Sequence, residues 1–398
     1  MGRIGKSIQY LIFIAALILA GEIVMRIFYG DGFLTKLDPQ IHHSRRAHID
    51  ITRKWGSGEK FRFITNSLGW RDDIPKRRVK KMSDKQLRIV FLGDSFTEAV
   101  GFDQDATFSG IAGELLRKAG YDCEVLNAGT ASYSPLIEYM QLKRFLDKGY
   151  KADIVVLLPD LSDVQDEVLY SSRFIFDKDN EPLRFNNIYY KSPLIYGLLN
   201  NSCLVRSAAQ TLKNLYDART ARVSKRAREQ TVEVSDISRS DLATQSRLRG
   251  NWELHTPSLS GWAKSGLVSL ELNIQRIRRL CDKNGIKLIV VIYPWPQQLY
   301  IKDDPVYYEV LKGYFRELYE AREGIYGKRP SLTPSLYETA LMSFSRREGI
   351  SLVNLYPEFV MMEGYAHKLY IANDIHMNKE GHNFVGGMIA DKIIEKIR

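Results

Sequence analysis

LRIVFLGDSFT, residues 87–97, decides the fold because it joins an apolar run to a glycine and then to a short polar turn. Leu87–Leu92 is rich in β-branched and large apolar residues, which predicts a short buried strand that Gly93 ends. Apolar residues with the spacing of a helix follow at Thr107–Lys118. In parallel α/β sheets, ligands bind at the carboxyl ends of the strands. We therefore expect Ser95 at the edge of the sheet where such proteins place their active groups.

The same alternation of strands and helices continues outward along the chain. The predicted strands are Cys123–Leu126, Ile154–Leu158 and Ile286–Tyr293, and the predicted helices are Leu136–Leu146 and about Leu267–Lys283. Buried strands that alternate with helices are typical of βαβ units. With 398 residues, of which 44% are hydrophobic, the chain has enough apolar material to form a large core. We predict a doubly wound parallel α/β sheet with helices on both faces.

The amino terminus carries an apolar run that predicts a transmembrane helix. Ile8–Tyr29 has about the length needed to cross ~30 Å of hydrocarbon, and its charges Glu22 and Arg26 are spaced to pair on one helical face. Arg3 and Lys6 precede the run, so the short amino end is expected in the cytoplasm and the rest outside it, in the periplasm of a Gram-negative cell. The alternative is a cleaved signal peptide, although no A-x-A site follows the run.

Domain boundaries follow from these patterns. We predict a cytoplasmic stub and anchor at 1–29, an irregular basic connector at 30–86 and a catalytic domain at 87–398, interrupted by a basic insertion at about 171–260. The formal charge of +10 suits an anionic partner, but an exported domain rarely meets nucleic acid, so nucleic-acid binding is disfavoured. The widely spaced Cys123, Cys203 and Cys281 argue against a cysteine-built metal site. Cys123 and Cys281 are expected to be buried as small hydrophobes.

A second motif lies near the carboxyl end, where residues 373–382 read NDIHMNKEGH. A serine is a weak nucleophile, so it needs a base, and the base needs an acceptor that orients it. Asp374 and His376 can supply both groups if their loop bends so that the carboxylate meets the imidazole. His382 is expected to pack near the start of the following helix.

With these motifs the chain resembles the SGNH/GDSL hydrolase family over about residues 87–398. Gly93-Asp94-Ser95 is similar to the family's first block, and residues 126–129 (LNAG) are similar to the second. Asp374 and His376 resemble the last block. The resemblance implies a three-layer, flavodoxin-like fold, a nucleophilic Ser95, a base His376 oriented by Asp374, and an oxyanion hole that uses the N–H groups of Ser95 and Gly129.

The third block departs from the family's pattern. The family usually has G-x-N-D after the third strand, with the Asn as an oxyanion donor, whereas residues 160–163 read DLSD. Ser162 falls on the Asn position, and a hydroxyl donates one hydrogen bond but reaches less far than an amide. Asp163 is a candidate substrate-binding residue. The carboxylates Asp160, Asp163, Asp166 and Glu167 lack EF-hand spacing, so no metal is expected there.

Other candidates are weaker. Trp295 and Gln297 follow the fourth strand and are candidate acceptor-site residues, because aromatic rings stack on sugars; a plain rigid turn is the alternative. His42, His43 and His48 lie in the basic connector without nearby carboxylates or cysteines, which favours a surface role over a metal site. No G-x-G-x-x-G or phosphate-loop spacing is present, and no cofactor is expected.

The sequence therefore predicts an extracytoplasmic serine esterase or O-acetyltransferase that acts on O-acyl groups. The resemblance implies a cell-envelope or secreted polysaccharide as substrate, and a membrane-bound partner as acyl donor in the transferase case. Two alternatives remain: an inactive scaffold that binds glycan or a membrane assembly partner, and a lipase or phospholipase.

Overall fold

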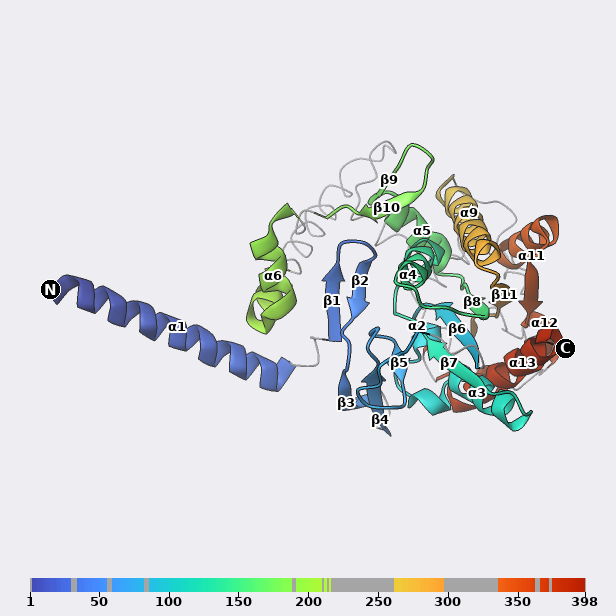
Figure 1. Cartoon of the computed structure of the whole chain (residues 1–398), viewed down its shortest axis with the longest axis horizontal. Helices are drawn as coiled ribbons and strands as arrows, with labels where there is room; N and C mark the ends of the chain where they lie inside the picture. Colours follow the sequence, from blue (N-terminus) through green and yellow to red (C-terminus); the bar gives the residue numbers. More distant parts are fainter. Residues whose placement is uncertain are drawn as a thin grey trace, which may run out of the picture. The chain divides into compact units, whose positions relative to one another are not determined.

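The computed structural model describes residues 2–29, 34–55, 59–81, 86–187, 191–209, 211–212, 215, 261–296, 336–361, 366–371 and 374–397. The chain divides into two compact units (Figure 1). One comprises Met1–Arg46 and Arg184–Gln245, and the other comprises Ala47–Leu183 and Ser246–Arg398. Every residue of the candidate site lies in the second unit, which is described first.

The second unit is built on an eight-stranded sheet with the order β12-β11-β8-β6-β7-β5-β4-β3. Five of its strands form a continuous parallel array: β6 (Leu87–Gly93), β7 (Cys123–Asn127), β8 (Ile154–Leu158), β11 (Lys287–Ile292) and β12 (Ser351–Asn354). Most of their apolar residues are buried, as expected for strands covered on both faces. The chain crosses to β7 on one side of β6 and to β8 on the other, so the reversal of strand order lies at β6. The predicted mixed α/β fold is confirmed.

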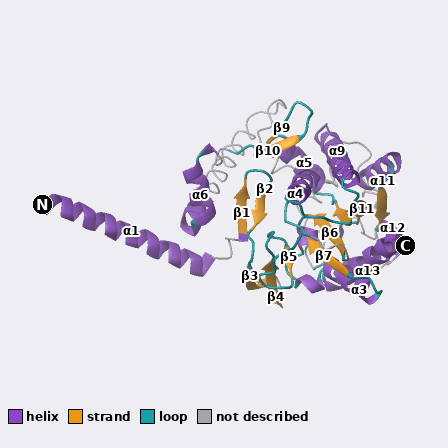
Figure 2. Ribbon diagram, in the orientation of Figure 1, coloured by secondary structure: helices purple, strands orange, loops and turns teal. Residues whose placement is uncertain are grey.

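Helices cover the sheet in two groups (Figures 1 and 2). The first is formed by α3 (Phe108–Lys118) and α13 (Lys379–Ile397), which pack on each other. Gly386 makes that packing close, because a Cβ on it would lie 2.9 Å from Ile111. The second group contains α4 (Pro135–Asp147), α5 (Asp163–Ser171), α9 (Gly261–Lys283) and α11 (Leu336–Glu348). The remaining helices are α2 (Ser95–Glu98), α12 (Tyr356–Met361) and the short 3₁₀ turns Gln104–Ala106 and Ala366–Leu369.

Part of the predicted basic connector belongs to the sheet, so the prediction of an irregular 30–86 segment is wrong. Three strands, β3 (Asp50–Trp55), β4 (Glu59–Thr65) and β5 (Arg71–Asp72), extend the sheet beyond β7 with antiparallel pairing. Phe61 and Phe63 are buried, while Lys60 before them and Arg62 between them are exposed. This period-two alternation is typical of a half-buried strand, and the high count of basic residues concealed it.

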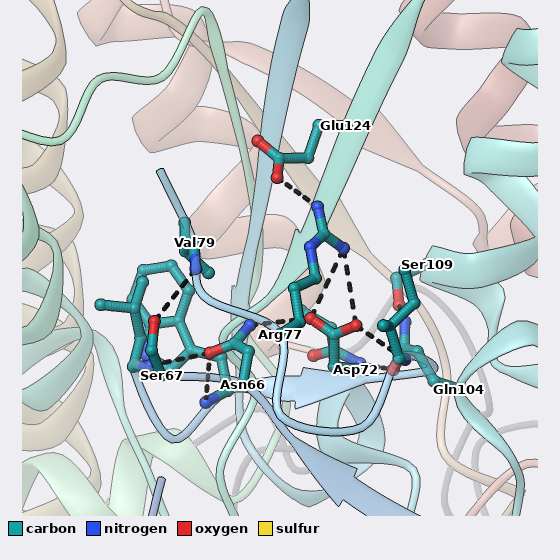
Figure 3. A network of polar contacts seen from close by, with 12 residues as sticks. Asn66, Ser67, Asp72, Arg77, Val79, Gln104, Ser109 and Glu124 are labelled. Carbon is teal, nitrogen blue, oxygen red and sulfur yellow. Dashed lines mark hydrogen bonds and ion pairs between the residues drawn. The ribbon is translucent and has the colours of Figure 1, made fainter. Parts of the chain in front are cut away.

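Polar contacts hold this extension against the parallel sheet (Figure 3). Asn66 donates to Asp72 at 3.0 Å, and Arg77 lies 3.5 Å from the same carboxylate. Arg77 also pairs with Glu124 on β7. The basic residues after β5 thus serve partly as structural partners of buried carboxylates.

The first unit contains α1 (Gly2–Tyr29), the antiparallel hairpin of β1 (Thr35–Asp38) and β2 (His42–Arg45), and α6 (Pro193–Asn201). In the described part of the chain, no helix has the length and apolar character needed to cross a membrane, which does not support the anchor predicted at Ile8–Tyr29. The predicted Glu22–Arg26 pair is present at 2.8 Å. Glu22 also accepts hydrogen bonds from the backbone N–H groups of Cys203 and Leu204 at 2.9 and 3.0 Å.

The predicted insertion at 171–260 is only partly described. Its described part contains β9 (Phe174–Phe176) and β10 (Pro182–Phe185), which pair with each other, and α6. Residues 216–260, with most of the basic run, lie outside the described residues. All three cysteines are buried, as predicted for Cys123 and Cys281. Burial raises the pKa of the Cys281 thiol to about 12.

Candidate active site

The turn after β6 presents the nucleophile candidate at the carboxyl edge of the sheet. Gly93 is required there, because a Cβ on it would lie 2.1 Å from the Thr97 Oγ1. Asp94 caps the short helix α2 by accepting the Phe96 N–H at 2.9 Å. Ser95 is the first residue of that helix, where backbone N–H groups have no partner within the helix. The Ser95 N–H is therefore placed to donate to a developing negative charge.

The loop before α13 bends as the predicted base and orienting acid require. The Ile371 N–H donates to the His376 carbonyl, and the Asp374 N–H donates to the Ile371 carbonyl, both at 2.9 Å. Met377 also forms an isolated β-bridge with Tyr370. This tight turn puts the Asp374 Oδ1 2.5 Å from the His376 Nδ1 and 3.1 Å from the His376 backbone nitrogen.

The other ring nitrogen of His376 reaches the serine. His376 Nε2 lies 2.8 Å from the Ser95 Oγ, which is within hydrogen-bond range although the two residues are far apart in sequence. Burial alone would raise the pKa of the Asp374 carboxyl, but the hydrogen bonds and charge of His376 lower it below its ordinary value. Asp374 is therefore the charged acceptor that fixes the imidazole with Nε2 facing Ser95. The predicted spatial meeting of the three residues is confirmed.

Gly129 does not occupy the predicted oxyanion role in this structure. Its N–H donates to the Asn127 Oδ1 at 3.0 Å, so the N–H is already engaged. Its lack of a side chain has a packing reason, since a Cβ would lie 2.4 Å from the Glu98 backbone nitrogen. Gly129 thus lets its loop pack closely against α2.

Asn127 is a residue that the sequence reasoning passed over. It is fully buried, and its amide nitrogen donates to the Thr97 carbonyl at 2.8 Å and to the Gln104 side chain at 3.0 Å. Asn127 thereby joins the end of β7 to α2, the helix that begins with Ser95. Only its place beside Gly129 in the LNAG block could have drawn attention to it.

Ser162 is also engaged elsewhere, against its predicted role as an oxyanion donor. Its hydroxyl donates to the Asp160 Oδ1 at 2.6 Å, and its backbone N–H donates to the same oxygen at 2.7 Å. A serine hydroxyl has one hydrogen bond to donate, and Ser162 donates it to Asp160. Of the three predicted oxyanion donors, only the Ser95 N–H is left without a competing acceptor among the contacts that the structure describes.

The predicted substrate-binding residues are mostly unavailable to a ligand. Asp163 is 1% exposed and accepts the Asp160 N–H at 3.0 Å, so it is a structural residue. Trp295 is 8% exposed, stacks on Phe96 and donates its indole N–H to Asp160 at 3.2 Å. Trp295 therefore packs against Phe96, and the Phe96 ring in turn lies 4.8 Å from the ring of His376. Gln297 lies outside the described residues.

The remaining histidine of the last motif is structural, as predicted. His382 is buried, and its Nδ1 accepts the Phe108 N–H at 3.3 Å. Burial, followed by the charge of His376, lowers its pKa to about 3. His382 therefore stays neutral and does not compete with His376 as a base. Within the described ranges, no group of three His, Cys, Asp or Glu side chains is arranged to hold a metal ion.

No protein-family model and no curated protein matches this chain. Solved structures do match it. The psychrotrophic esterase EstA from Pseudoalteromonas sp. is 10% identical, with 78% of this chain and 98% of the esterase covered and a TM-score of 0.37. The acetyl xylan esterase AlAXEase is 12% identical, with 78% and 100% covered and a TM-score of 0.37.

A third similar structure is a GDSL-like lipase from Bacteroides thetaiotaomicron, which is 13% identical, with 80% of this chain and 93% of the lipase covered and a TM-score of 0.34. Similarity at this level carries no residue assignment, and the roles proposed for Ser95, Asp374 and His376 rest on the distances in this chain. In its motifs and in its serine-histidine-aspartate arrangement, the chain resembles the SGNH/GDSL hydrolases.

Proposed function

We propose that this chain is an SGNH-type serine hydrolase that acts on ester bonds. The observation that carries the proposal is the continuous hydrogen-bonded series from Asp374 through His376 to the Ser95 hydroxyl, at 2.5 and 2.8 Å. Such a series is what a weak oxygen nucleophile needs, because the base must lie within reach of the proton that it removes.

The proposed reaction has two halves. Ser95 Oγ bonds to the ester carbonyl carbon while His376 Nε2 takes the hydroxyl proton, and the Ser95 N–H donates to the resulting oxyanion. The carbonyl re-forms, the bond to the alcohol oxygen breaks, and His376 returns the proton to the leaving alcohol. A water or a second hydroxyl then attacks the acyl carbon while His376 takes its proton. The bond from the acyl carbon to Ser95 Oγ breaks, and His376 returns the proton to that oxygen. Asp374 stabilises the imidazolium in both halves.

The activity test uses p-nitrophenyl acetate and the full chain. We expect p-nitrophenol release that Ser95→Ala and His376→Ala abolish. Ser162→Ala is the matched serine control, since its hydroxyl bonds Asp160 and not the base. Equal release by the wild type and the two triad variants, in folded protein, would overturn the proposal.

We further propose that the substrate is an O-acyl group, acetyl above all, on an acidic cell-envelope or secreted polysaccharide. The formal charge of +10 supports an anionic polymer as substrate. Whether the acyl group passes to water or to a sugar hydroxyl separates an esterase from an O-acetyltransferase, and a membrane-bound partner would supply acyl groups to the latter. Acetyl transfer to an added glycan, measured by mass spectrometry, distinguishes them.

A second candidate function is an inactive scaffold that binds glycan or an assembly partner. The observation that favours it is the engagement of two predicted oxyanion donors, Gly129 by Asn127 and Ser162 by Asp160. Loss of one oxyanion donor typically costs about 2.7–4 kcal/mol of transition-state stabilisation. The scaffold predicts glycan binding that Ser95→Ala leaves unchanged, together with no Ser95-dependent ester cleavage. A lipase would instead prefer long acyl esters over acetate.

We also propose that the hydrolase domain works outside the cytoplasm. Basic residues ahead of an apolar segment are typical of an export signal peptide, so Arg3 and Lys6 before residues 8–29 support this location without a membrane-spanning anchor. An alkaline phosphatase fused after Arg398, a reporter that is active only outside the cytoplasm, should be active. An inactive fusion of normal abundance would refute the proposed location.

A further inference from the structure

Behind the nucleophile, the structure gathers acidic side chains from several elements. Asp94 ends the turn after β6, Asp160 follows β8, Asp163 begins α5 and Glu138 lies in the first turn of α4. All four are between 0 and 4% exposed. We call these four residues the carboxyl cluster. Its member Asp94 lies next to Ser95, with its Oδ2 3.2 Å from the Ser95 Oγ.

Each aspartate of the carboxyl cluster accepts a hydrogen bond, whereas Glu138 has no donor among the described residues. Asp94 accepts the Phe96 N–H, Asp160 accepts from Ser162 and Trp295, and Asp163 accepts the Asp160 N–H. In the described part of the chain, both carboxyl oxygens of Glu138 are buried without a hydrogen-bond partner. The same is true of the Asp163 Oδ1 and of the hydroxyls of Tyr293 and Tyr337, which interact electrostatically with the cluster.

Among the described residues, the strongest electrostatic neighbours of Glu138 are carboxyls and not cations. These neighbours are Asp94, Glu167 and Asp160, and Glu138 in turn acts on Asp163. Burial first, and then these charges, raise the pKa of Glu138 well above its ordinary value. An ionised carboxylate that is buried and unpaired is costly, and such a group takes up a proton instead.

We propose that Glu138 is a positioning residue that keeps a proton inside the carboxyl cluster and thereby limits the negative charge behind Ser95. The reason lies in the reaction. The oxyanion forms next to Ser95, so each ionised carboxyl close behind it opposes the charge that the transition state develops. Glu138 acts through its electrostatic interaction with Asp94 and is a positioning residue that touches no substrate.

Glu167 provides a matched control, because it is also a fully buried helical glutamate. Its carboxylate accepts from Ser134, the Leu136 N–H, Ser269 and Asn273, at 2.6 to 3.0 Å. Glutamine is a close mimic of a protonated glutamic acid, but its NH₂ group cannot accept these bonds. Glu138→Gln should therefore be tolerated, whereas Glu167→Gln should lower the melting temperature.

The first test is infrared spectroscopy of the full chain at pH 7, which does not depend on activity. Burial also raises the pKa values of Asp94 and Asp163 well above their ordinary values, so wild type should show a carbonyl stretch from more than one protonated carboxyl. Glu138→Gln should lose the part of that band that Glu138 contributes, and Glu167→Gln should keep the band. An unchanged band in Glu138→Gln would overturn the proposal, as would a fall in melting temperature as large as that of Glu167→Gln.

The second test is the pH dependence of kcat/KM for p-nitrophenyl acetate, and this part rests on the proposed function. Glu138→Gln should stay within about threefold of wild type at pH 7, and its alkaline loss of activity should move up by at least about one pH unit, since it has no proton to release. If kcat/KM of wild type and of Glu138→Gln falls over the same alkaline pH range, the role of Glu138 is refuted. If wild type itself cleaves no ester, the hydrolase proposal fails while the infrared test still decides the protonation of Glu138.

Discussion

Gly129→Ala tests whether close packing under α2 positions the nucleophile. A Cβ at this position would lie 2.4 Å from the Glu98 backbone nitrogen and 2.5 Å from the Thr97 carbonyl carbon, whereas ordinary contact begins near 3.4 Å. The overlap is about 1 Å and is made with backbone, so no side-chain rotation relieves it. Either the Gly129 loop or α2 must move by a comparable distance.

The cost of that movement can be bounded. Overpacking of this kind typically destabilises by about 1–3 kcal/mol. Ser95 begins α2 and lies 2.8 Å from the His376 Nε2, so a shift near 1 Å takes it out of hydrogen-bond range. A misplacement of about 1 Å can cost on the order of 10²-fold in rate. We expect Gly129→Ala to lose that much kcat/KM for p-nitrophenyl acetate and to unfold at a lower temperature.

Gly387→Ala is the control, because a Cβ on Gly387 in α13 would have no atom within 4 Å. Replacing a helical glycine by alanine in open space should stabilise by about 0.5–1 kcal/mol, with unchanged activity. Normal activity and stability of Gly129→Ala would refute the packing argument and would mean that the loop relaxes freely around α2.

Three further predictions test other parts of the structure. Asp374→Asn should lower kcat by roughly 10⁴-fold, the size expected when the orienting acid of a triad is lost. The pKa of Asp374 is lowered in the fold, so its ionised form stabilises the chain above the unfolded pKa. The difference in unfolding free energy between wild type and Asp374→Asn, measured with urea, should therefore shrink as the pH falls through the folded pKa. Asn127→Ala should cost about 1–3 kcal/mol for each buried group left unpaired, and a melting temperature equal to that of wild type would count against its bridging role. Phe63→Ala, at a side chain that is 1% exposed, should cost about 3–5 kcal/mol; a negligible cost in thermal unfolding would show that β4 contributes nothing to the core.

The parallel sheet and the triad could be predicted from sequence because both leave local signals. Leu87–Leu92, which is apolar apart from Arg88, and the wholly apolar Ile154–Leu158 have the length of a strand, and each is followed by the polar residues of the carboxyl edge. Ser95 and His376 lie in short motifs at opposite ends of the domain, and their meeting at 2.8 Å follows from the packing of α13 beside α3.

The antiparallel extension and the partners of the predicted oxyanion donors could not be predicted in the same way. Strand β4 alternates Phe61 and Phe63 with basic residues, and composition over the whole 30–86 segment averages this pattern away. Asn127 and Asp160 take the hydrogen bonds of Gly129 and Ser162. Sequence motifs name which groups can donate, but only three-dimensional geometry shows which acceptor each group meets.

The most direct test of the central claim is covalent labelling of Ser95 by a fluorophosphonate, read by mass spectrometry of the full chain and of its peptides. The structure predicts one phosphonyl group on Ser95, no labelling of Ser95→Ala, and greatly slowed labelling of His376→Ala, because the hydroxyl needs the base 2.8 Å away to release its proton. Labelling elsewhere in the chain, or equal labelling of wild type and His376→Ala, would contradict the assignment of Ser95 and His376 as nucleophile and base.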